Sequence, residues 1–116
     1  MRKVSETVVK AFLAGKEKRV GNTYTNGIRL YLHGNMIAIR DTNGELKVST
    51  AGWNTNTTRE RLNCLFSFLF SFGYESHITR VFQRKGNSYF AMTNGINVSC
   101  DGWVVAGTLQ ETAKVG

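Results

Sequence analysis

Hydrophobic and polar residues alternate with a period of two in two separate parts of the chain, and each part predicts three β-strands. The first three are expected over Arg29 to His33, Met36 to Arg40 and Glu45 to Ser49. The second three are expected over Ile78 to Arg84, Ser88 to Met92 and Ile96 to Cys100. The chain is therefore expected to hold two antiparallel meanders.

In the first meander the alternation predicts one buried face and one open face. The buried face is expected to consist of Leu30, Leu32, Ile37, Ile39, Leu46 and Val48. The open face is expected to carry Arg29, Tyr31, His33, Arg40 and Lys47, with Glu45 as its one acid. In the second meander four neighbouring large residues compete for the inside, so that sheet is expected to be covered on both faces; they are Val81, Phe82, Tyr89 and Phe90.

The turns must rely on glycine, because the chain has twelve glycines and no proline. Three Asn-Gly pairs have the composition of a type I′ turn, in which both central residues have positive φ. Asn43-Gly44 and Asn94-Gly95 lie between expected strands and predict hairpins, whereas Asn26-Gly27 is not assigned to one.

The two meanders share a sequence pattern, which indicates an internal repeat. Gly34-Asn35, Thr42-Asn43-Gly44, Val48-Ser49 and Gly52-Trp53 recur in order as Gly86-Asn87, Thr93-Asn94-Gly95, Val98-Ser99 and Gly102-Trp103. The offset falls from 52 to 50 residues along the repeat. Duplication, or convergent use of one strand-turn-strand unit, explains repeat units at about 29–53 and 80–103, whereas chance matches among common turn residues are the alternative.

A long apolar helix is expected between the meanders, from Thr58 to Phe72. Thr57 and Glu60 have the spacing of a capping box, and Gly73 suits the left-handed position after the helix. Its apolar stripe spans more than half the circumference, which is typical of a helix buried on two sides. The alternative is that Phe68 or Phe70 contacts a partner protein or a second copy of the chain.

A shorter helix is expected near the N-terminus, capped by Ser5 and ended by Gly15. Its apolar stripe consists of Val8, Val9, Phe12 and Leu13. Lys16 to Arg19 is expected to be a charged loop, and the segment after Gly107 has no clear period. The sequence thus predicts a single α+β domain over residues 1–116, in the order α-βββ-α-βββ, with the two meanders packed around the apolar helix.

Length and composition exclude several other classes of protein. The longest strongly apolar stretch, Leu62 to Phe72, is too short for a membrane span and contains two serines. The N-terminal residues lack the apolar core of a signal peptide, so the expected location is the cytoplasm of the cell that makes the protein. Cys64 and Cys100 are expected to be reduced thiols, and with two histidines at wide spacings they predict no metal site and no cofactor.

The charged residues do not have the pattern of an active site. The acids are scattered, no sequence motif connects His33 or His77 to a cysteine or serine, and no phosphate-binding loop or zinc-protease motif is present. The chain is therefore expected not to be an enzyme. The weak alternative is a novel nuclease or hydrolase built on Asp41, Glu45 and Glu60.

Six segments resemble those of a family of small proteins from tailed bacteriophages and their prophages. The resemblance rests on Ala11-Phe12, Gly15-Lys16, Gly21-Asn22-Thr23, Leu30-Tyr31-Leu32-His33-Gly34-Asn35, Ile37-Ala38 and the block from Gly52 to Asn63, which reads GWNTNTTRERLN. It covers about residues 11 to 63. It implies a phage origin, a location in the cytoplasm of the infected bacterial host, and an accessory protein that binds phage or host macromolecules; it implies no reaction.

The net charge of +7 favours a polyanionic partner. Residues 1–61 hold eleven of the fifteen basic residues and five of the eight acidic ones. Cations interleaved with aromatic rings on one sheet face are typical of a surface that binds phosphates and stacks bases. The predicted nucleic-acid-binding residues are Lys16, Lys18, Arg19, Arg29, Tyr31, Arg40, Lys47, Arg59 and Arg61. The alternative is a solvated face of a basic protein.

Three further features leave alternatives open. The polar run after Gly52 predicts a recognition loop with Trp53, Asn54 and Asn56, or else a rigid polar connection. Trp53 and Trp103 either pack on the core, which is favoured, or stand out as stacking platforms. A second function is a phage modulator of a host protein, such as a polymerase or defence component, that docks through the aromatic helix or a sheet edge. Polar meander edges also leave a homodimer open.

Overall fold

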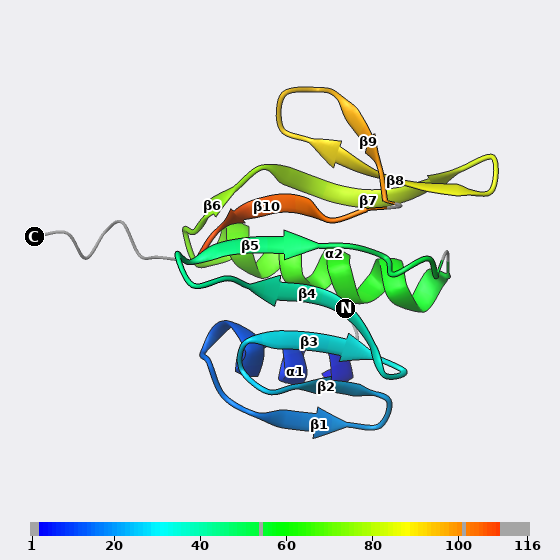
Figure 1. Cartoon of the computed structure of the whole chain (residues 1–116). Helices are drawn as coiled ribbons and strands as arrows, with labels where there is room; N and C mark the ends of the chain where they lie inside the picture. The colour runs from blue at the N-terminus through cyan, green and yellow to red at the C-terminus, as the bar shows by residue number, and fades with distance from the viewer. Residues whose placement is uncertain (1–2, 54, 101, 110–116) are drawn as a thin grey trace, which may run out of the picture.

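The computed structural model describes residues 3–53, 55–100 and 102–109. These residues form two helices and ten strands, and the strands are arranged in two antiparallel sheets (Figure 1). The helices are α1 (Lys3–Leu13) and α2 (Asn56–Ser71). The larger sheet has the order β1-β2-β3-β4-β5-β10-β6, and the smaller has the order β7-β8-β9. The larger sheet contains β1 (Lys18–Val20), β2 (Thr23–Thr25), β3 (Arg29–Leu32), β4 (Asn35–Arg40), β5 (Glu45–Val48), β6 (Glu75–Ser76) and β10 (Val104–Thr108). The smaller contains β7 (Ile78–Arg84), β8 (Asn87–Met92) and β9 (Asn97–Ser99). The predicted α+β class and both meanders are confirmed.

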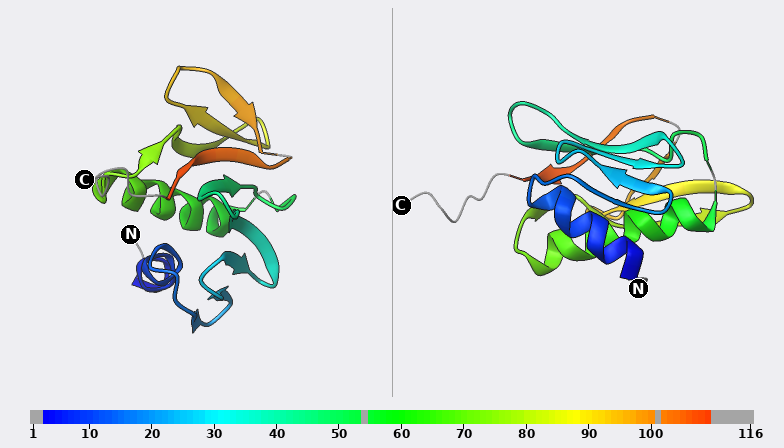
Figure 2. Two further views of the ribbon diagram at one scale, coloured as in Figure 1. Left: turned by 60° about the vertical axis from the view of Figure 1, so that its left-hand side comes forward. Right: turned by 90° about the horizontal axis from the view of Figure 1, so that it is seen from below.

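Both helices lie on the same side of the larger sheet, and no helix of the described residues lies on the other side, which is called the helix-free face below (Figures 1 and 2). The apolar stripe of α1 is buried as predicted and packs on β1, β2 and β3. Helix α2 contacts α1, β6 and β7, so it lies at the centre of one continuous core. Phe66 of α2 meets Phe90 of β8 edge to face, with ring centroids 6.0 Å apart. Burial on several sides explains the wide apolar stripe of this helix.

The sequence pattern does not predict four of the strands, because each is short or irregular. These strands are β1, β2, β6 and β10. Lys18–Val20 forms the edge strand β1, so the prediction of a charged loop over Lys16 to Arg19 is wrong for its second half. Val104–Thr108 forms β10 between β5 and β6, with a bulge at Val105 to Gly107 that removes any alternation.

The two Asn-Gly hairpins are confirmed, but their turn type differs from the prediction. Within each Asn-Gly pair only the glycine has a positive φ, and the Gly44 and Gly95 N–H groups donate to the carbonyls of Asp41 and Met92 at 3.1 and 3.0 Å. Each is therefore a type I turn followed by a left-handed glycine. The third pair, Asn26-Gly27, also joins two strands, β2 and β3.

The type I′ turns lie instead at the β3–β4 and β7–β8 connections, which occupy equivalent positions in the two meanders. His33-Gly34 has φ values of +52° and +79°, and Lys85-Gly86 has +52° and +82°. Strand register also corresponds, since Ala38 pairs with Val48 as Phe90 pairs with Val98, at the offsets of 52 and 50 residues. The two meanders thus share both turn types and the register of their second and third strands, but the irregularity between β3 and β4 has no counterpart at the same position of β7 and β8.

Both predicted N-caps are wrong. Helix α2 begins one residue after Thr55, whose hydroxyl accepts a hydrogen bond from the Thr58 N–H at 3.2 Å. Glu60 does not complete a capping box, because its carboxylate accepts a hydrogen bond from the Ser5 hydroxyl at 2.5 Å and pairs with a buried arginine. Ser5 lies inside α1 and is fully buried, so it connects the two helices and does not cap the first.

Candidate nucleic-acid interface

A β-bulge between β3 and β4 decides which side chains face away from the helices. Leu30 pairs with Ala38 while Tyr31 pairs with Met36, so Ile37 is an extra residue on β4. Ile37 and Ala38 are consequently both buried, and the alternation reverses after them. Ile39 then lies on the helix-free face, contrary to the prediction.

The same reversal turns Arg40 toward the helices, so its predicted place on the open basic face is wrong. Arg40 pairs in register with the buried Leu46. Its Nη2 donates to the carbonyls of Phe12 at 2.7 Å and Leu13 at 3.4 Å, at the C-terminal end of α1. Burial lowers the pKa of this guanidinium. Arg40 therefore caps α1 and cannot bind a phosphate on the open face.

The helix-free face carries a row of side chains that run across four strands in register. Arg19, Tyr24, Tyr31 and Met36 are successive cross-strand partners on β1, β2, β3 and β4. The Tyr24 and Tyr31 rings are stacked, with centroids 5.9 Å apart and planes inclined by 26°. The Arg19 guanidinium lies 4.5 Å from the Tyr24 centroid. Of these residues only Tyr31 was predicted on this face, since Arg19 was expected in a charged loop and Tyr24 is an addition.

A second row on the same face contains Arg29, Ile39 and Lys47. Arg29 is exposed and supplies an available cation. Lys47 is less available, because its Nζ lies 3.8 Å from Asp41 and 3.9 Å from Glu45. Half-exposed ion pairs of this kind contribute little to stability, but they offset the charge that would attract a phosphate.

Two predicted lysines flank this face without belonging to it. Lys16 is exposed just before β1, and its N–H donates to the Ala11 carbonyl at 2.9 Å. Lys18 pairs with the buried Thr25, so it lies on the helix side of the edge strand and is exposed there. Both can attract a polyanion over a distance, but neither adds a contact on the face.

Arg59 and Arg61 are buried, so their predicted role in phosphate binding is wrong. Arg59 is 9% exposed, and its guanidinium donates to Ser88 at 3.3 Å and to Asn56. Arg61 is 4% exposed and donates to Thr23 at 3.0 Å, to Ser5 at 2.7 Å and to Glu60. Each guanidinium thus joins α2 to another part of the fold.

The predicted recognition loop borders a small cavity of about 190 Å³. The cavity lies between the β3–β4 turn and the start of α2, and His33, Asn35, Trp53 and Thr55 are among its lining residues. Trp53 is 54% exposed and Trp103 is 45% exposed, so the expected core packing of both is wrong. Asn56 is engaged by Arg59, and Asn54 lies outside the described residues.

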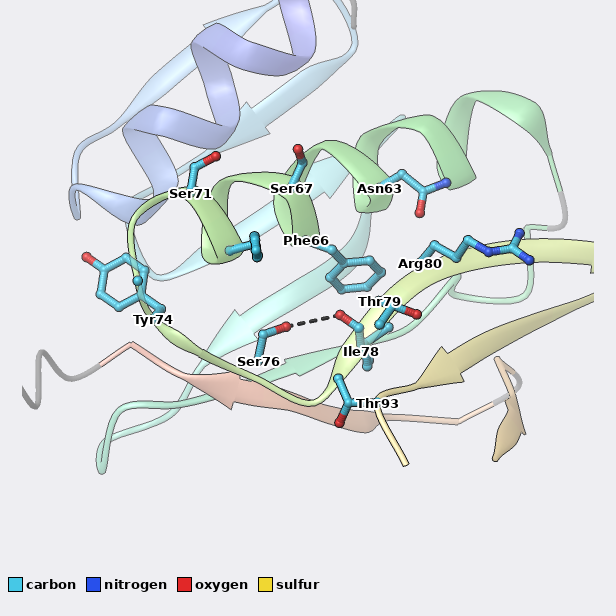
Figure 3. A pocket seen from close by; sticks show the side chains of 12 residues that line it. Asn63, Phe66, Ser67, Ser71, Tyr74, Ser76, Ile78, Thr79, Arg80 and Thr93 are labelled. Atoms are coloured by element: carbon cyan, nitrogen blue, oxygen red, sulfur yellow. Dashed lines mark hydrogen bonds between the residues drawn. The ribbon is translucent and has the colours of Figure 1, made fainter. Parts of the chain in front are cut away.

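The C-terminal half of α2 borders a larger cavity of about 830 Å³ (Figure 3). Phe66 projects from α2 toward β7, and Ser76, Ile78 and Thr93 lie across from it (Figure 3). Phe70 is 76% exposed at the rim. Phe68 is half-buried, stacks on Phe72 at 5.5 Å and packs against the core. Of the two predicted contact residues, Phe70 is accessible and Phe68 is mainly part of the packing.

The smaller sheet carries a basic and aromatic cluster that the sequence analysis missed. Val81 and Phe90 face the core, so the cross-strand pair Phe82 and Tyr89 faces away from it. These two rings stack with centroids 5.8 Å apart. The guanidinium carbons of Arg80 and Arg84 lie 4.8 and 5.5 Å from the Phe82 centroid. The alternation of Arg80, Phe82 and Arg84 was the available signal.

The remaining polar chemistry is dispersed. No group of three or more His, Cys, Asp or Glu side chains in the described part of the chain is placed to hold a metal ion. His33 and His77 lie near Asn22 and Glu75 respectively, at 3.1 and 3.9 Å. Neither α1 nor α2, as described, is long and apolar enough to cross a membrane.

Cys64 and Cys100 are buried, each 1% exposed and neither in a disulfide, which leads to a reactivity prediction. Burial, reinforced by Glu60 and Glu6, raises the pKa of Cys64 to about 12. Because the thiolate is the reactive form, the native protein is expected to react with almost no Ellman's reagent at pH 8. In denaturant both thiols should react. Rapid reaction of one thiol equivalent in the native state would contradict the buried position.

The fold and this site describe a small α+β protein with one helix-free sheet face that combines cations and tyrosines. The chain belongs to the Kyanoviridae Gp96 protein family, a family of cyanophage proteins, whose model matches residues 1–109. The predicted phage origin is thereby confirmed, and the similarity extends well beyond residues 11 to 63. No curated protein and no solved structure matches the chain.

Proposed function

We propose that the protein is a non-enzymatic accessory protein of the phage that binds nucleic acid through the helix-free face of the larger sheet. The observation that carries this proposal is the stack of Arg19, Tyr24 and Tyr31 across three strands, flanked by Arg29. The guanidinium groups would bind phosphates and the rings would contact bases or sugars. An open sheet face suits an extended ligand.

The charge distribution limits how strongly this face can bind. Glu17 accepts a hydrogen bond from the Tyr24 hydroxyl at 2.7 Å, and Asp41 and Glu45 offset Lys47. Arg19 and Arg29 are thus the principal cations of the face. We expect moderate affinity with a shallow salt dependence, because few phosphates are contacted.

The test is the Arg19→Met/Arg29→Met double variant, titrated against labelled single-stranded and duplex DNA and RNA by fluorescence anisotropy. We expect affinity at physiological salt to fall about tenfold or more, and the slope of log K against log salt to become shallower by about 1.4 to 1.8. Lys10→Met is the control for charge, since Lys10 is exposed on α1. Unchanged binding by the double variant would contradict the proposal, as would an equal loss per charge in Lys10→Met.

A second candidate function, a modulator of a host protein, is favoured by one observation. Phe70 is 76% exposed beside a cavity lined in part by Phe66 and Ile78, and exposed aromatic residues are typical anchors of protein interfaces. Phe70→Ser is expected to keep the melting temperature and to abolish capture of a specific host protein from lysate. If the wild-type protein and the Phe70→Ser variant capture the host protein equally, this function is contradicted.

A further inference from the structure

The outer face of the smaller sheet has the composition of a second polyanion-binding surface. Between Glu75 and Asp101 the chain contains three basic residues and no acid. The three are Arg80 and Arg84 on β7 and Lys85 in the β7–β8 turn, and all are exposed. On the larger sheet two acids offset Lys47, whereas no acid from the stretch between Glu75 and Asp101 can offset these cations. Charge complementarity therefore favours an anionic partner.

The aromatic pair on this face adds a second kind of contact. Phe82 and Tyr89 are half-buried cross-strand partners whose stacked rings have planes inclined by 30°. The Arg80 and Arg84 guanidinium groups, at 4.8 and 5.5 Å from the Phe82 centroid, border the pair. An arginine plane beside an aromatic ring can hold a base by stacking while its N–H groups reach the adjoining phosphates.

The stacking surface distinguishes single strands from duplexes. In a duplex the bases are stacked on one another, so a ring on a sheet face reaches only the backbone. In a single strand the bases can turn outward and stack on protein rings, and this contact tolerates any base. The type I′ turn at Lys85-Gly86 places a further cation at the end of the same hairpin.

From these observations we infer that the face formed by Arg80, Phe82, Arg84 and Tyr89 is a binding site for single-stranded nucleic acid. This inference rests on the proposed function, in that it assumes that the chain binds nucleic acid. It goes further by assigning a second surface and a strand preference. The larger sheet would contribute phosphate contacts to either kind of strand, and the smaller sheet would favour single strands.

The test compares an oligothymidylate of about 20 nucleotides with a duplex of equal length, both labelled and titrated at physiological salt. Phe82→Leu/Tyr89→Leu keeps apolar side chains but removes both rings. It is expected to weaken oligothymidylate binding about tenfold or more and to leave duplex binding within about twofold. Arg80→Met/Arg84→Met changes exposed residues only, so it keeps the test valid if the ring variant folds poorly. It is expected to weaken single-strand binding and to reduce its salt slope by about 1.4.

The comparison variant is Arg19→Met/Arg29→Met, which removes two cations from the larger sheet and is expected to weaken the binding of both probes. Loss of single-strand affinity in the Arg80/Arg84 and ring variants supports the inference, and it does so even if the comparison variant binds normally. Wild-type affinity in the Arg80/Arg84 variant overturns the inference, whereas a loss in the comparison variant alone would leave the proposed function standing. If the wild-type protein binds neither probe, both the inference and the proposed function are overturned.

Discussion

Replacing Arg61 with methionine is expected to lower the free energy of unfolding by about 3 kcal/mol. The guanidinium joins three elements, since it donates to Thr23 of β2, to Ser5 of α1 and to Glu60 of α2. Its removal leaves two buried hydroxyls without this donor and leaves the Glu60 carboxylate without its cation. The loss falls at the low end for a broken buried ion pair, because the Glu60 side chain keeps 23% of its surface exposed.

Urea unfolding measures this effect as a lower midpoint at an unchanged slope. Arg29→Met is the matched control, because it makes the same change at an exposed position and is expected to alter the free energy by less than about 0.5 kcal/mol. Arg61→Met/Glu60→Gln is expected to recover part of the loss, since no uncompensated charge remains. If Arg61→Met unfolds at the same urea concentration as Arg29→Met, the buried network does not stabilise the fold.

The sequence predicted those elements whose pattern repeats over several residues. Both meanders, the long apolar helix and the buried stripe of α1 follow from periodicity, which reflects the burial of one face. Strands such as β1 and β6 have three and two residues, too few for a period to appear. Strand β10 contains a bulge, and its place in the sheet depends on pairing with β5 across more than fifty residues of chain.

The site could be predicted only in part, because a single extra residue reverses the alternation. The bulge at Ile37 turns Arg40 inward and Ile39 outward, and no local sequence pattern predicts this bulge. Arg59 and Arg61 were assigned to phosphate binding because they lie at the start of the predicted helix, yet the structure supplies buried hydroxyl partners from distant segments. Tyr31 and Arg29 were assigned correctly to the open face, since they precede the bulge, whereas Arg19 was expected in a charged loop and lies on β1. Partners from distant segments are the information that a local reading lacks.

The close approach of two backbone segments at Gly27 leads to the second large expected effect. A Cβ added to Gly27 would lie 2.6 Å from the Gly15 carbonyl oxygen and 2.7 Å from its carbon. Both are backbone atoms, so no side-chain rotation relieves the contact. Gly27 also has a φ of +94°, which L-residues adopt only with strain. Gly27→Ala is therefore expected to lower the free energy of unfolding by about 2–4 kcal/mol.

Gly34→Ala separates the two causes of that loss. Gly34 has a φ of +79° in the β3–β4 turn, but no heavy atom lies within 4 Å of an added Cβ. Its alanine variant is expected to lose only the strain of positive φ, about 1–2 kcal/mol. The excess loss in Gly27→Ala, measured by urea unfolding, then reports the contact between the β2–β3 turn and the segment that follows α1. Because this contact positions β2 and β3 against the helix, it also sets the strands that carry Tyr24 and Tyr31. Equal losses of unfolding free energy in the two variants would show that the Gly15 backbone moves away from the added Cβ at no cost in stability. These strands would then be positioned by the core alone.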